Sequence, residues 1–555
     1  MRGESLPLQL HVVAAYPFCG DTPQRPGWYF TMDILTEICE KRLSDIKAKG
    51  FSFGHKIPEK RTRPVVPFLP QPGTILEIKR ASPSKGWIAP ELDSEKTAKT
   101  YIKAGTSAIS CLTEENYFHG SLEDLQKTCR AAGKKTAVLR KDFLLEPEEI
   151  EIAYRCGADA VLLIARILKT EKLISMAEKA FELGISVLLE VREDSDIEKA
   201  FFVLSKAHEK NADDKILLGI NSRDLATFTI DLLIPLKLKE RISKIYKEKG
   251  ADLPFPRVIS ESGVTTPAAA DFVGNLGFHG VLIGEAAARN PKEAKKLVSS
   301  FKDGALKKQL AYEYAFWKKL AAKLENKSPE KPLVKICGLT DENDAVKAAG
   351  LGADLLGFIF AEKSKRNNGT GIEIEKKLTA IREKLSSMTA GGEIKSLPLM
   401  VGVIVEPASK EGQFAYQLCY KGILDGIQFH GCSEFADGAT GYSAVPLADA
   451  NDLEEIKLLN AVGFPRVLID AKNVSSGNAR GDARYGGTGK TIDEKLVTEA
   501  KKIGTLWLSG GITPENVKQL VSDFKPELID VASGIESEPG KKDLDKMKNL
   551  FRELK

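Results

Sequence analysis

A carboxylate and an ammonium lie two residues apart in the stretch LEIKRASPSKG, residues 76–86. Successive side chains of a strand point to opposite faces, so a strand here would place Glu77 and Lys79 on one face. Desolvating a charge costs about several kcal/mol unless the charge is paired or used, and a surface ion pair, worth about 0–1 kcal/mol, is the simpler interpretation. Ser82 and the backbone amides that follow it offer hydrogen-bond donors to an anion, which would give the pair a chemical role.

The elements that would position these residues recur along the whole chain. Short aliphatic runs alternate with amphipathic helical stretches, eight before a Lys- and Ala-rich segment at 311–332 and eight after it. Continuous apolar strands separated by helices favour a parallel sheet covered on both faces, and eight per unit matches a closed barrel. We therefore predict an α/β protein built from two tandem (β/α)8 TIM barrels. A doubly wound sheet is disfavoured because neither first strand is followed by a GxGxxG fingerprint.

The same pattern divides the chain into three parts. We expect residues 1–31 to form a poorly ordered extension without a role in the chemistry, residues 32–326 to form the first barrel, and residues 331–555 the second. The polar stretch KSPEK at 327–331 contains a proline, as a short boundary would. Because this junction is short, we expect the barrels to touch.

Composition excludes several classes of function. The formal net charge is +4 against 81 basic and 77 acidic residues, which is not the basic stripe of a nucleic-acid-binding protein. No apolar run reaches the about 18 residues of a membrane span. Eight cysteines are scattered without a CxxC pair, which favours reduced thiols in the cytoplasm over disulfides or a zinc site. We expect a cytoplasmic monomer without metal or cofactor.

Polar residues close many of the predicted strands. In a (β/α)8 barrel the active site lies at the carboxyl ends of the strands, so these residues are the candidates for chemistry. In the first barrel they are Glu77, Lys79, Lys141, Glu190, Asn221, Glu261 and Ser262, and in the second they are Cys337, His430, Asp470 and Asp530.

Motifs on both halves resemble two known enzyme families. The first half resembles indole-3-glycerol-phosphate synthase through EIKRASPSKG, LRKDFL, LLEVREDSDIEKA, GINSRDL and SESGV. The second half resembles phosphoribosylanthranilate isomerase through KICGLTDENDA, IQFHG, GGTGKTID, LSGGITPENV and DVASGIESEPGKKD. The resemblance covers all but the first 31 residues, and it implies a bifunctional enzyme of tryptophan biosynthesis that acts on phosphosugars.

The implied reactions follow one another, in the reverse of their order along the chain. By resemblance, the second barrel converts N-(5-phosphoribosyl)anthranilate to 1-(2-carboxyphenylamino)-1-deoxyribulose 5-phosphate by an Amadori rearrangement. The first barrel then closes this product to indole-3-glycerol phosphate, with loss of carbon dioxide and water.

In the isomerase half the resemblance implies that Cys337 is the general base and Asp470 the general acid. A thiol is mostly protonated at neutral pH, so we expect Lys335 or a helix terminus to lower the pKa of Cys337. A small buried hydrophobe is the alternative role for an isolated cysteine. Further substrate contacts are expected from Arg366, His430, Gly487, Gly489, Gly510, Gly511, Asp530, Ser533 and Gly534, the glycines serving the phosphate.

In the synthase half the resemblance implies that Lys141 is the acid that activates the substrate carbonyl. Glu77 and Glu190 are available as base or acid, Lys79 holds substrate or donates a proton, and the assignment of each step stays open. Asn221 is expected to contact the substrate hydroxyls. Binding is expected from Ser82, Phe118, Phe143, Arg223, Glu261, Ser262, Gly263, Gly284 and Glu285.

Some features depart from the family patterns or fit other functions. Glu285 stands where the family usually carries a small residue, Ser222 replaces a second asparagine, and no proline precedes Arg366. The GGTGK run contains only the tail of a Walker phosphate loop, so ATP binding is not expected. A histidine-pathway isomerase would carry an aspartate in place of Cys337, and a non-catalytic scaffold would be expected to lose the acid and base residues.

Overall fold

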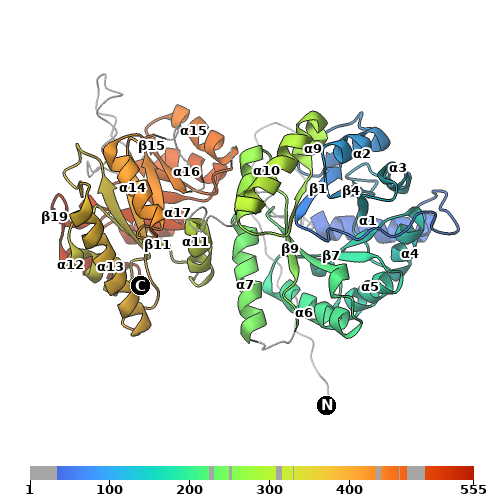
Figure 1. Ribbon diagram of the computed structural model, residues 1–555, viewed down its shortest axis with the longest axis horizontal. Helices are drawn as coiled ribbons and strands as arrows, with labels where there is room; N and C mark the ends of the chain where they lie inside the picture. The colour runs from blue at the N-terminus through green and yellow to red at the C-terminus, as the bar shows by residue number, and fades with distance from the viewer. Residues whose placement is uncertain are drawn as a thin grey trace, which may run out of the picture.

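The computed structural model describes residues 34–223, 230–248, 253–307, 315–328, 330–432, 438, 440–461, 463–471 and 494–555. Two closed barrels of eight parallel strands lie side by side, each surrounded by helices (Figure 1). The predicted fold of two tandem (β/α)8 barrels is confirmed. The expected extension at 1–31 lies outside the described residues.

Neighbouring strands of the first barrel pair in parallel, and β1 closes the ring against β10. In chain order its strands are β1 (Gly73–Ile78), β4 (Ala108–Leu112), β5 (Ala137–Lys141), β6 (Ala160–Ile164), β7 (Ser186–Val191), β8 (Ile216–Asn221), β9 (Arg257–Glu261) and β10 (Gly280–Ile283). Its helices are α1 (Ile34–Lys49), α2 (Ser94–Lys103), α3 (Leu122–Ala132), α4 (Pro147–Cys156), α5 (Thr170–Glu182), α6 (Asp194–Glu209), α7 (Ile234–Glu248), α8 (Pro267–Asn275), α9 (Glu285–Arg289) and α10 (Ala294–Lys307).

The second barrel repeats this plan, with β11 closing against β18. Its strands are β11 (Leu333–Cys337), β12 (Leu355–Phe360), β13 (Leu399–Ile404), β14 (Gly426–His430), β15 (Gly441–Leu447), β16 (Val467–Ala471), β17 (Trp507–Ser509) and β18 (Leu528–Val531). The helices are α12 (Glu342–Leu351), α13 (Ile372–Ala390), α14 (Lys410–Tyr420), α15 (Ala450–Ala461), α16 (Glu494–Ile503), α17 (Val517–Phe524) and α18 (Leu544–Glu553).

Small elements decorate the loops. Two hairpins that the apolar pattern did not predict pair β2 (Ala81–Ser82) with β3 (Gly86–Trp87) and β19 (Glu536–Glu538) with β20 (Lys541–Lys542). These strands are too short to carry a periodic signal. Short 3-10 helices cover Ala165–Ile167, Asp213–Lys215, Pro291–Glu293 and Ser533–Ile535.

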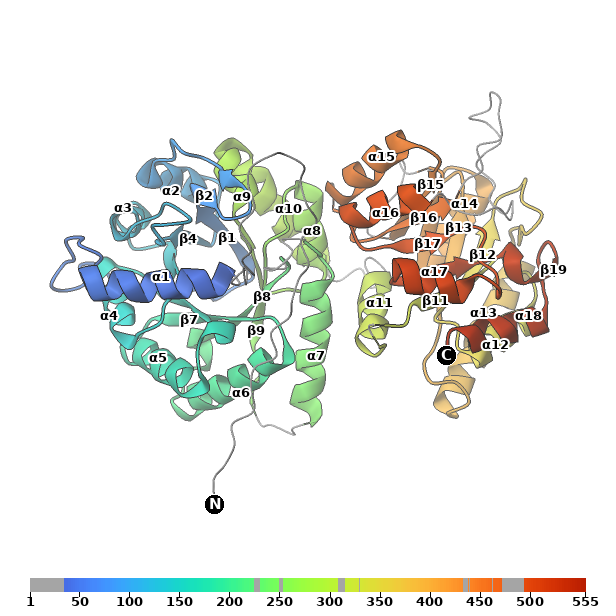
Figure 2. The same cartoon turned by 180° about the vertical axis from the view of Figure 1, so that it is seen from behind.

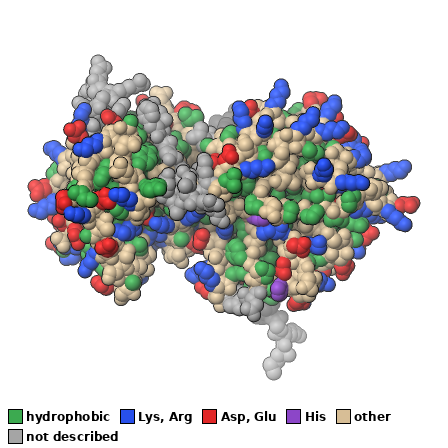
Figure 3. Space-filling model, in the orientation of Figure 1, with side chains coloured by type: hydrophobic (Ala, Val, Ile, Leu, Met, Phe, Trp, Pro, Cys, Tyr) green, Lys and Arg blue, Asp and Glu red, His purple; other side chains and the backbone are tan. Residues whose placement is uncertain are grey.

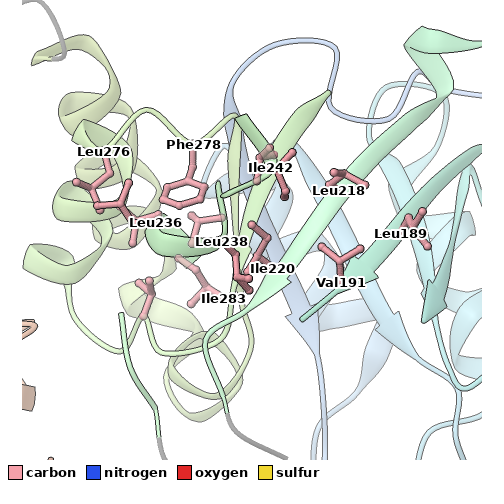
Figure 4. Close-up of a cluster of buried hydrophobic side chains, with 14 of the residues drawn as sticks. Leu189, Val191, Leu218, Ile220, Leu236, Leu238, Ile242, Leu276, Phe278 and Ile283 are labelled. Carbon is pink, nitrogen blue, oxygen red and sulfur yellow. The ribbon is translucent and has the colours of Figure 1, made fainter. Parts of the chain in front are cut away.

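Alternation along each strand divides its side chains between the barrel interior and the helix layer. Figure 4 shows Leu218 and Ile220 of β8 facing the helices, with Leu236 and Ile242 of α7 in the same cluster. All four side chains are buried. At about 25 cal/mol per Å2, burial of this layer drives the closure of helices onto strands.

Each barrel is closed at its amino end by the segment that precedes its first strand. Phe68 and Leu69 cover the first barrel and pack with the initial residues of its strands. Helix α11 (Ala315–Glu325) does the same for the second, since a Cβ on Gly426 of β14 would lie 2.8 Å from the ring of Phe316. Trp317 of α11 is fully buried there.

Helix α11 lies between the two barrels in both views (Figures 1 and 2). The rings of Trp317 and Phe272 of α8 have centroids 6.2 Å apart, and those of Trp317 and Trp507 of β17 are 6.5 Å apart. One hydrophobic cluster therefore runs from the helices of the first barrel to the strands of the second. The expectation that the barrels touch is confirmed.

Charges of both signs are interspersed on the surface in the view of Figure 3. Among the described helices, none combines the length and the apolar composition that crossing a bilayer requires.

Candidate active sites

Glu77 and the lysines around it form an ion cluster at the carboxyl end of the first barrel. The Nζ of Lys141, the last residue of β5, lies 3.3 Å from Glu77 Oε2 and 3.3 Å from Glu261 Oε2. Lys79 Nζ lies 3.8 Å from Glu77 Oε1, and Ser110 Oγ donates a hydrogen bond of 3.2 Å to Glu77 Oε2. Glu77 is only 2% exposed, so this is an interior cluster and not a surface ion pair.

Two glycines make room for the carboxylates of this cluster. A Cβ on Gly219, in the middle of β8, would lie 2.0 Å from Glu261 Oε1. A Cβ on Gly284, which follows β10, would lie 2.7 Å from Glu77 Oε1. The backbone thus approaches the carboxylates at these two positions because glycine has no side chain. Gly284, which was predicted to bind substrate, therefore borders the ion cluster around Glu77.

The surroundings separate the pKa values of the two candidate catalytic carboxylates. Burial raises the pKa of Glu77, but Lys141 and Lys79 outweigh it, so the pKa lies below its ordinary value. Burial and then Glu261 raise the pKa of Glu190 to about 8, against which Lys141 acts only in part. Two carboxyl groups held in different protonation states are a common arrangement for acid and base catalysis.

The pKa values of the two lysines of the cluster are also shifted in opposite directions. Burial lowers the pKa of Lys141, but Glu77, Glu261 and Glu190 together raise it by a larger amount, so the net shift of the pKa is upward. Burial lowers the pKa of Lys79, and Glu77 only partly opposes this. Lys141 is therefore held as an ammonium, whereas Lys79 gives up its proton more readily than an ordinary lysine.

An aromatic wall stands beside the lysines. The ring centroids of Phe118 and Phe143 lie 6.0 Å apart, and Lys79 Nζ lies 5.3 Å from the centroid of Phe118. Both phenylalanines are only partly buried. A planar ring bound against them would lie close to the ammonium of Lys79.

The loops after β1, β8, β9 and β10 carry the remaining candidates. Asn221 Oδ1 accepts the backbone N–H of Arg223 at 3.0 Å. Burial lowers the pKa of Arg223, and Glu285 opposes this through its charge. Glu285 itself is paired with Arg289 at 3.0 Å on α9. A carboxylate therefore stands in the first turn of α9, directly after Gly284, where an anion was expected.

The turn after β9 carries two of the predicted binding residues. Ser262 and Gly263 follow the strand with φ angles of +66° and +82°. Both residues thus have left-handed φ angles, which are uncommon for a serine. Ser82, in the β2–β3 hairpin, is buried.

A buried network behind Lys141 was missed by the sequence reading. Asp142 accepts hydrogen bonds from Arg42 Nη1 of α1 at 2.7 Å and from the backbone N–H of Phe143 at 2.9 Å. Arg42 also pairs with Glu149 of α4. These contacts fix the turn between Lys141 and Phe143. The only signal in the sequence was the aspartate of LRKDF, because Arg42 is 100 residues away.

In the second barrel, the centre of the mouth is built around Cys337 at the end of β11. Two residues earlier, Lys335 Nζ lies 2.6 Å from Asp530 Oδ2 and 2.7 Å from Gln428 Oε1. Burial and then Asp530 raise the pKa of Cys337, and Lys335 and Lys542 oppose this only in part. The expectation that Lys335 brings the pKa of the thiol below its ordinary value is therefore wrong, because burial and the Asp530 charge outweigh the lysine.

Asp470 and His430 lie together beside this centre. Ser509 Oγ donates to Asp470 Oδ1 at 2.7 Å, and His430 Nε2 lies 3.7 Å from Asp470 Oδ2. Burial raises the pKa of Asp530, and its environment includes the charges of Lys335, Asp470 and His430. Asp530 is thus coupled to the surroundings of Cys337 on one side and to Asp470 on the other.

Arg366 is held across the mouth by a carboxylate that the sequence reading did not single out. Its Nε and Nη2 donate to Glu536 at 2.9 and 2.7 Å. A Cβ on Gly338, next to Cys337, would lie 2.6 Å from Arg366 Cδ, so the arginine passes over this glycine. Lys542 Nζ donates to Glu536 Oε1 at 2.8 Å and to the Cys337 carbonyl at 2.6 Å. Both missed residues lie in the ESEPGKKD run, which gave no strand or helix signal.

The loops after β17 and β18 pack closely together. Gly510 and Gly511 have φ angles of +91° and +63°. A Cβ on Gly534 would lie 2.0 Å from the carbonyl oxygen of Ile512, so only glycine allows this contact. Ser533 begins the 3-10 helix at this point. The predicted Gly487 and Gly489 lie outside the described residues.

Comparison with known proteins finds a different enzyme family in each barrel. Residues 52–299 match the family model of indole-3-glycerol phosphate synthase, and residues 334–553 match that of N-(5′-phosphoribosyl)anthranilate (PRA) isomerase.

Relatives cover one barrel or both. A tryptophan biosynthesis protein TrpCF of Vibrio cholerae is 30% identical over 87% of this chain and 86% of its own length. A multifunctional tryptophan biosynthesis protein of Phycomyces blakesleeanus is 30% identical over 87% of this chain, which spans 63% of that relative's length. An indole-3-glycerol phosphate synthase of Carboxydothermus hydrogenoformans is 41% identical over 40% of this chain and 77% of its own length.

Proposed function

This chain belongs to the TrpCF family of tryptophan biosynthesis proteins, which joins a synthase barrel to an isomerase barrel, and from that premise we propose that it catalyses two successive steps. The C-terminal barrel isomerises N-(5-phosphoribosyl)anthranilate to 1-(2-carboxyphenylamino)-1-deoxyribulose 5-phosphate. The N-terminal barrel closes this phosphosugar to indole-3-glycerol phosphate. The observation that carries the proposal is that each barrel mouth holds its own set of converging acids and bases.

In the isomerase, ring opening needs a proton on the furanose oxygen as the bond from C1′ to that oxygen breaks. We assign this donation to Asp470, whose neighbours Ser509 and His430 orient its two oxygens. Cys337 then removes the proton from C2′ of the resulting iminium, and the enolamine tautomerises to the ketone. The amides of the loops at Gly510, Gly511, Ser533 and Gly534 hold the phosphate, and Arg366 meets the anthranilate carboxylate.

In the synthase, the first step joins the aromatic carbon that bears the carboxyl group to the C2′ ketone. Lys141 donates a proton to the ketone oxygen, since its ion pairs with Glu77 and Glu261 hold it as an ammonium. The carboxyl group then leaves as carbon dioxide, and the ring regains its aromaticity. Phe118 and Phe143 position the anthranilate ring, and Lys79 and Arg223 attract its carboxylate.

The last synthase step removes water. Glu190, with a pKa of about 8, is protonated at neutral pH and delivers its proton to the leaving hydroxyl. Glu77, whose pKa is lowered, is ionised and takes a proton from the C1′ methylene. Asn221 contacts the sugar hydroxyls, Glu261 keeps Lys141 oriented, and Ser82, Ser262, Gly263, Gly284 and the amide of Glu285 surround the phosphate.

The test is to supply the purified chain with phosphoribosylanthranilate and to follow indole-3-glycerol phosphate by absorbance. Formation of this product without any added cofactor supports the proposal, and we expect both activities to survive treatment with EDTA. Accumulation of the open-chain intermediate alone would refute the synthase assignment. Absence of any turnover of phosphoribosylanthranilate would refute the isomerase assignment.

We further propose the division into residues 32–326 and 331–555, a cytoplasmic location and a monomeric state. Free thiols at Cys111, Cys129, Cys156, Cys337 and Cys419 are typical of a reducing compartment. Helix α11 lies on the first side of this division but packs beneath the second barrel. Light scattering of the purified chain tests the monomer, since a mass of twice 60.6 kDa would contradict it.

A further inference from the structure

Arg466 lies at the amino end of β16, on the side of the second barrel that faces the first. Its Nη1 and Nη2 donate to Asp231 Oδ1 and Oδ2 of the first barrel at 2.8 and 2.9 Å. Nη2 and Nε also donate to Glu527, at 2.9 and 2.5 Å, and Nη1 donates to the Pro465 carbonyl at 2.7 Å. All five N–H donors of the guanidinium are therefore used, and its side chain is 1% exposed.

Asp231 belongs to the segment that follows β8 at the mouth of the first barrel. Its backbone N–H donates to the Ser222 carbonyl at 3.0 Å, and its Oδ1 accepts the N–H of Leu233 at 2.8 Å, just before α7. Ser222 in turn donates from its backbone and its Oγ to the Glu261 carbonyl, both at 2.9 Å. Asp231 thus ties the end of β8 to the start of α7.

The neighbours of Asp231 form one wall of the predicted phosphate site. A Cβ on Gly263 would lie 2.8 Å from side-chain atoms of Ile230, of Leu232 and of Ser222. Ile230 also forms a β-bridge with Arg223, two residues after Asn221. A displacement of Asp231 would therefore move the residues that support both the Ser262–Gly263 turn and Arg223.

We propose that Arg466 of the isomerase barrel is a positioning residue for the substrate-binding wall of the synthase barrel. The bidentate pair with Asp231 holds residues 230–232 against Gly263. A residue of the isomerase barrel therefore helps to position the phosphate site of the synthase barrel. This inference rests on the proposed synthase function of the first barrel.

The placement of Arg466 separates this role from the chemistry of its own barrel. It precedes β16, whereas Asp470 lies near the carboxyl end of that strand, four residues later and about 13 Å away at about 3.3 Å per residue. A buried ion pair adds little net stability compared with an apolar pair, but its bidentate geometry fixes the relative position of two groups strictly. Loss of the pair should therefore affect substrate binding in the first barrel more than catalysis in the second.

The experiment compares Arg466→Gln with Arg241→Gln in the full chain. Arg241 of α7 pairs with Glu325 of α11 and with Asp194, so its loss removes ion pairs near the same interface without touching residues 230–232. For Arg466→Gln we expect the synthase KM for carboxyphenylamino-deoxyribulose phosphate to rise about tenfold, with kcat within about twofold. Isomerase constants of both variants, and the synthase KM of Arg241→Gln, should stay within about twofold of those of the unaltered chain.

A second variant covers the case in which Arg466→Gln fails to fold, which loss of isomerase activity would reveal. Asp231→Asn keeps the Arg466–Glu527 pair and removes only the charge that crosses between the barrels. We expect it to raise the synthase KM by a similar factor, and where both variants fold the double variant should be no worse than either single one. An unchanged synthase KM in Asp231→Asn, additive effects, or an equal rise in Arg241→Gln would overturn the inference. Absence of ring closure in the unaltered chain would instead refute the proposed function.

Discussion

The two barrel mouths use the same kind of residue at different depths. Lys141 is the last residue of β5, and its side chain is 15% exposed between the carboxylates of Glu77 and Glu261. Lys335 lies two residues before the end of β11, points to the same face as Cys337, and is completely buried against Asp530 and Gln428. A shift of two residues along a strand, which keeps the side chain on the same face, therefore distinguishes the two lysines. The ammonium of Lys141 can reach a substrate, whereas that of Lys335 is an internal counter-ion. Depth along the strand decides between chemistry and support.

The largest effect should come from removing the reacting group of one mouth at a time. We expect Cys337→Ala to lower isomerisation by at least about 10³-fold and to spare ring closure, and Lys141→Ala to do the reverse. The reason is that each group belongs to a separate ion network in a separate barrel. Each activity is measured with its own substrate, phosphoribosylanthranilate or the open-chain ribulose phosphate. A folded variant that lost both activities would contradict the two-site assignment.

The next effect tests the acid of the synthase mouth. Glu190→Gln keeps the shape of the side chain but removes the transferable proton, so we expect kcat for ring closure to fall about 10²- to 10⁴-fold. Glu198→Gln, on the exposed face of α6, is the matched control and should leave kcat unchanged. The measurement is single-turnover kinetics with detection of the decarboxylated intermediate. If the variant turned over at the normal rate, the dehydration would need another donor.

The two mouths should respond to pH in opposite directions. In the proposed mechanism Glu190 acts in its protonated form, so kcat/KM for ring closure should fall as pH rises through about 8. In the proposed mechanism Cys337 acts as the thiolate, and the pKa of this thiol is raised, so kcat/KM for isomerisation should increase by up to about tenfold per pH unit over the same range. Profiles measured separately on one preparation check this. Parallel profiles would remove the distinction between a protonated carboxyl group and a thiolate.

How much of this could be predicted from sequence depends on the range of the interaction. The strand ends that carry Glu77, Lys141 and Cys337 were found because apolar runs of local periodicity mark where a barrel strand stops. The partner of Arg466 could not be found, because Asp231 lies 235 residues away and neither residue stands in a periodic pattern. The net pKa of Cys337 was predicted in the wrong direction since burial depends on the whole fold.

Substitutions at the amino ends of the barrels should have the smallest effect on turnover. Their effect on the free energy of unfolding should be large. Phe68 covers only the first barrel, whereas Trp317 packs against Phe272 of the first and Trp507 of the second and donates from its indole N–H to the Gly438 carbonyl at 2.8 Å. Replacing either ring by alanine removes a buried aromatic group far from both mouths. We expect both kcat values to stay within about twofold and the free energy of unfolding to fall by about 3–5 kcal/mol.

The distribution of that loss should differ between Phe68→Ala and Trp317→Ala. Each activity is followed during urea denaturation, so that each barrel reports its own midpoint. Phe68→Ala should lower the midpoint for ring closure and leave the isomerase midpoint unchanged, because its contacts stay within the first barrel. Trp317→Ala should lower both midpoints, because one cluster joins the helices of the first barrel to the strands of the second. If Trp317→Ala lowered only the isomerase midpoint, α11 would act as a cover for the second barrel alone, and the two barrels would be energetically independent at this contact.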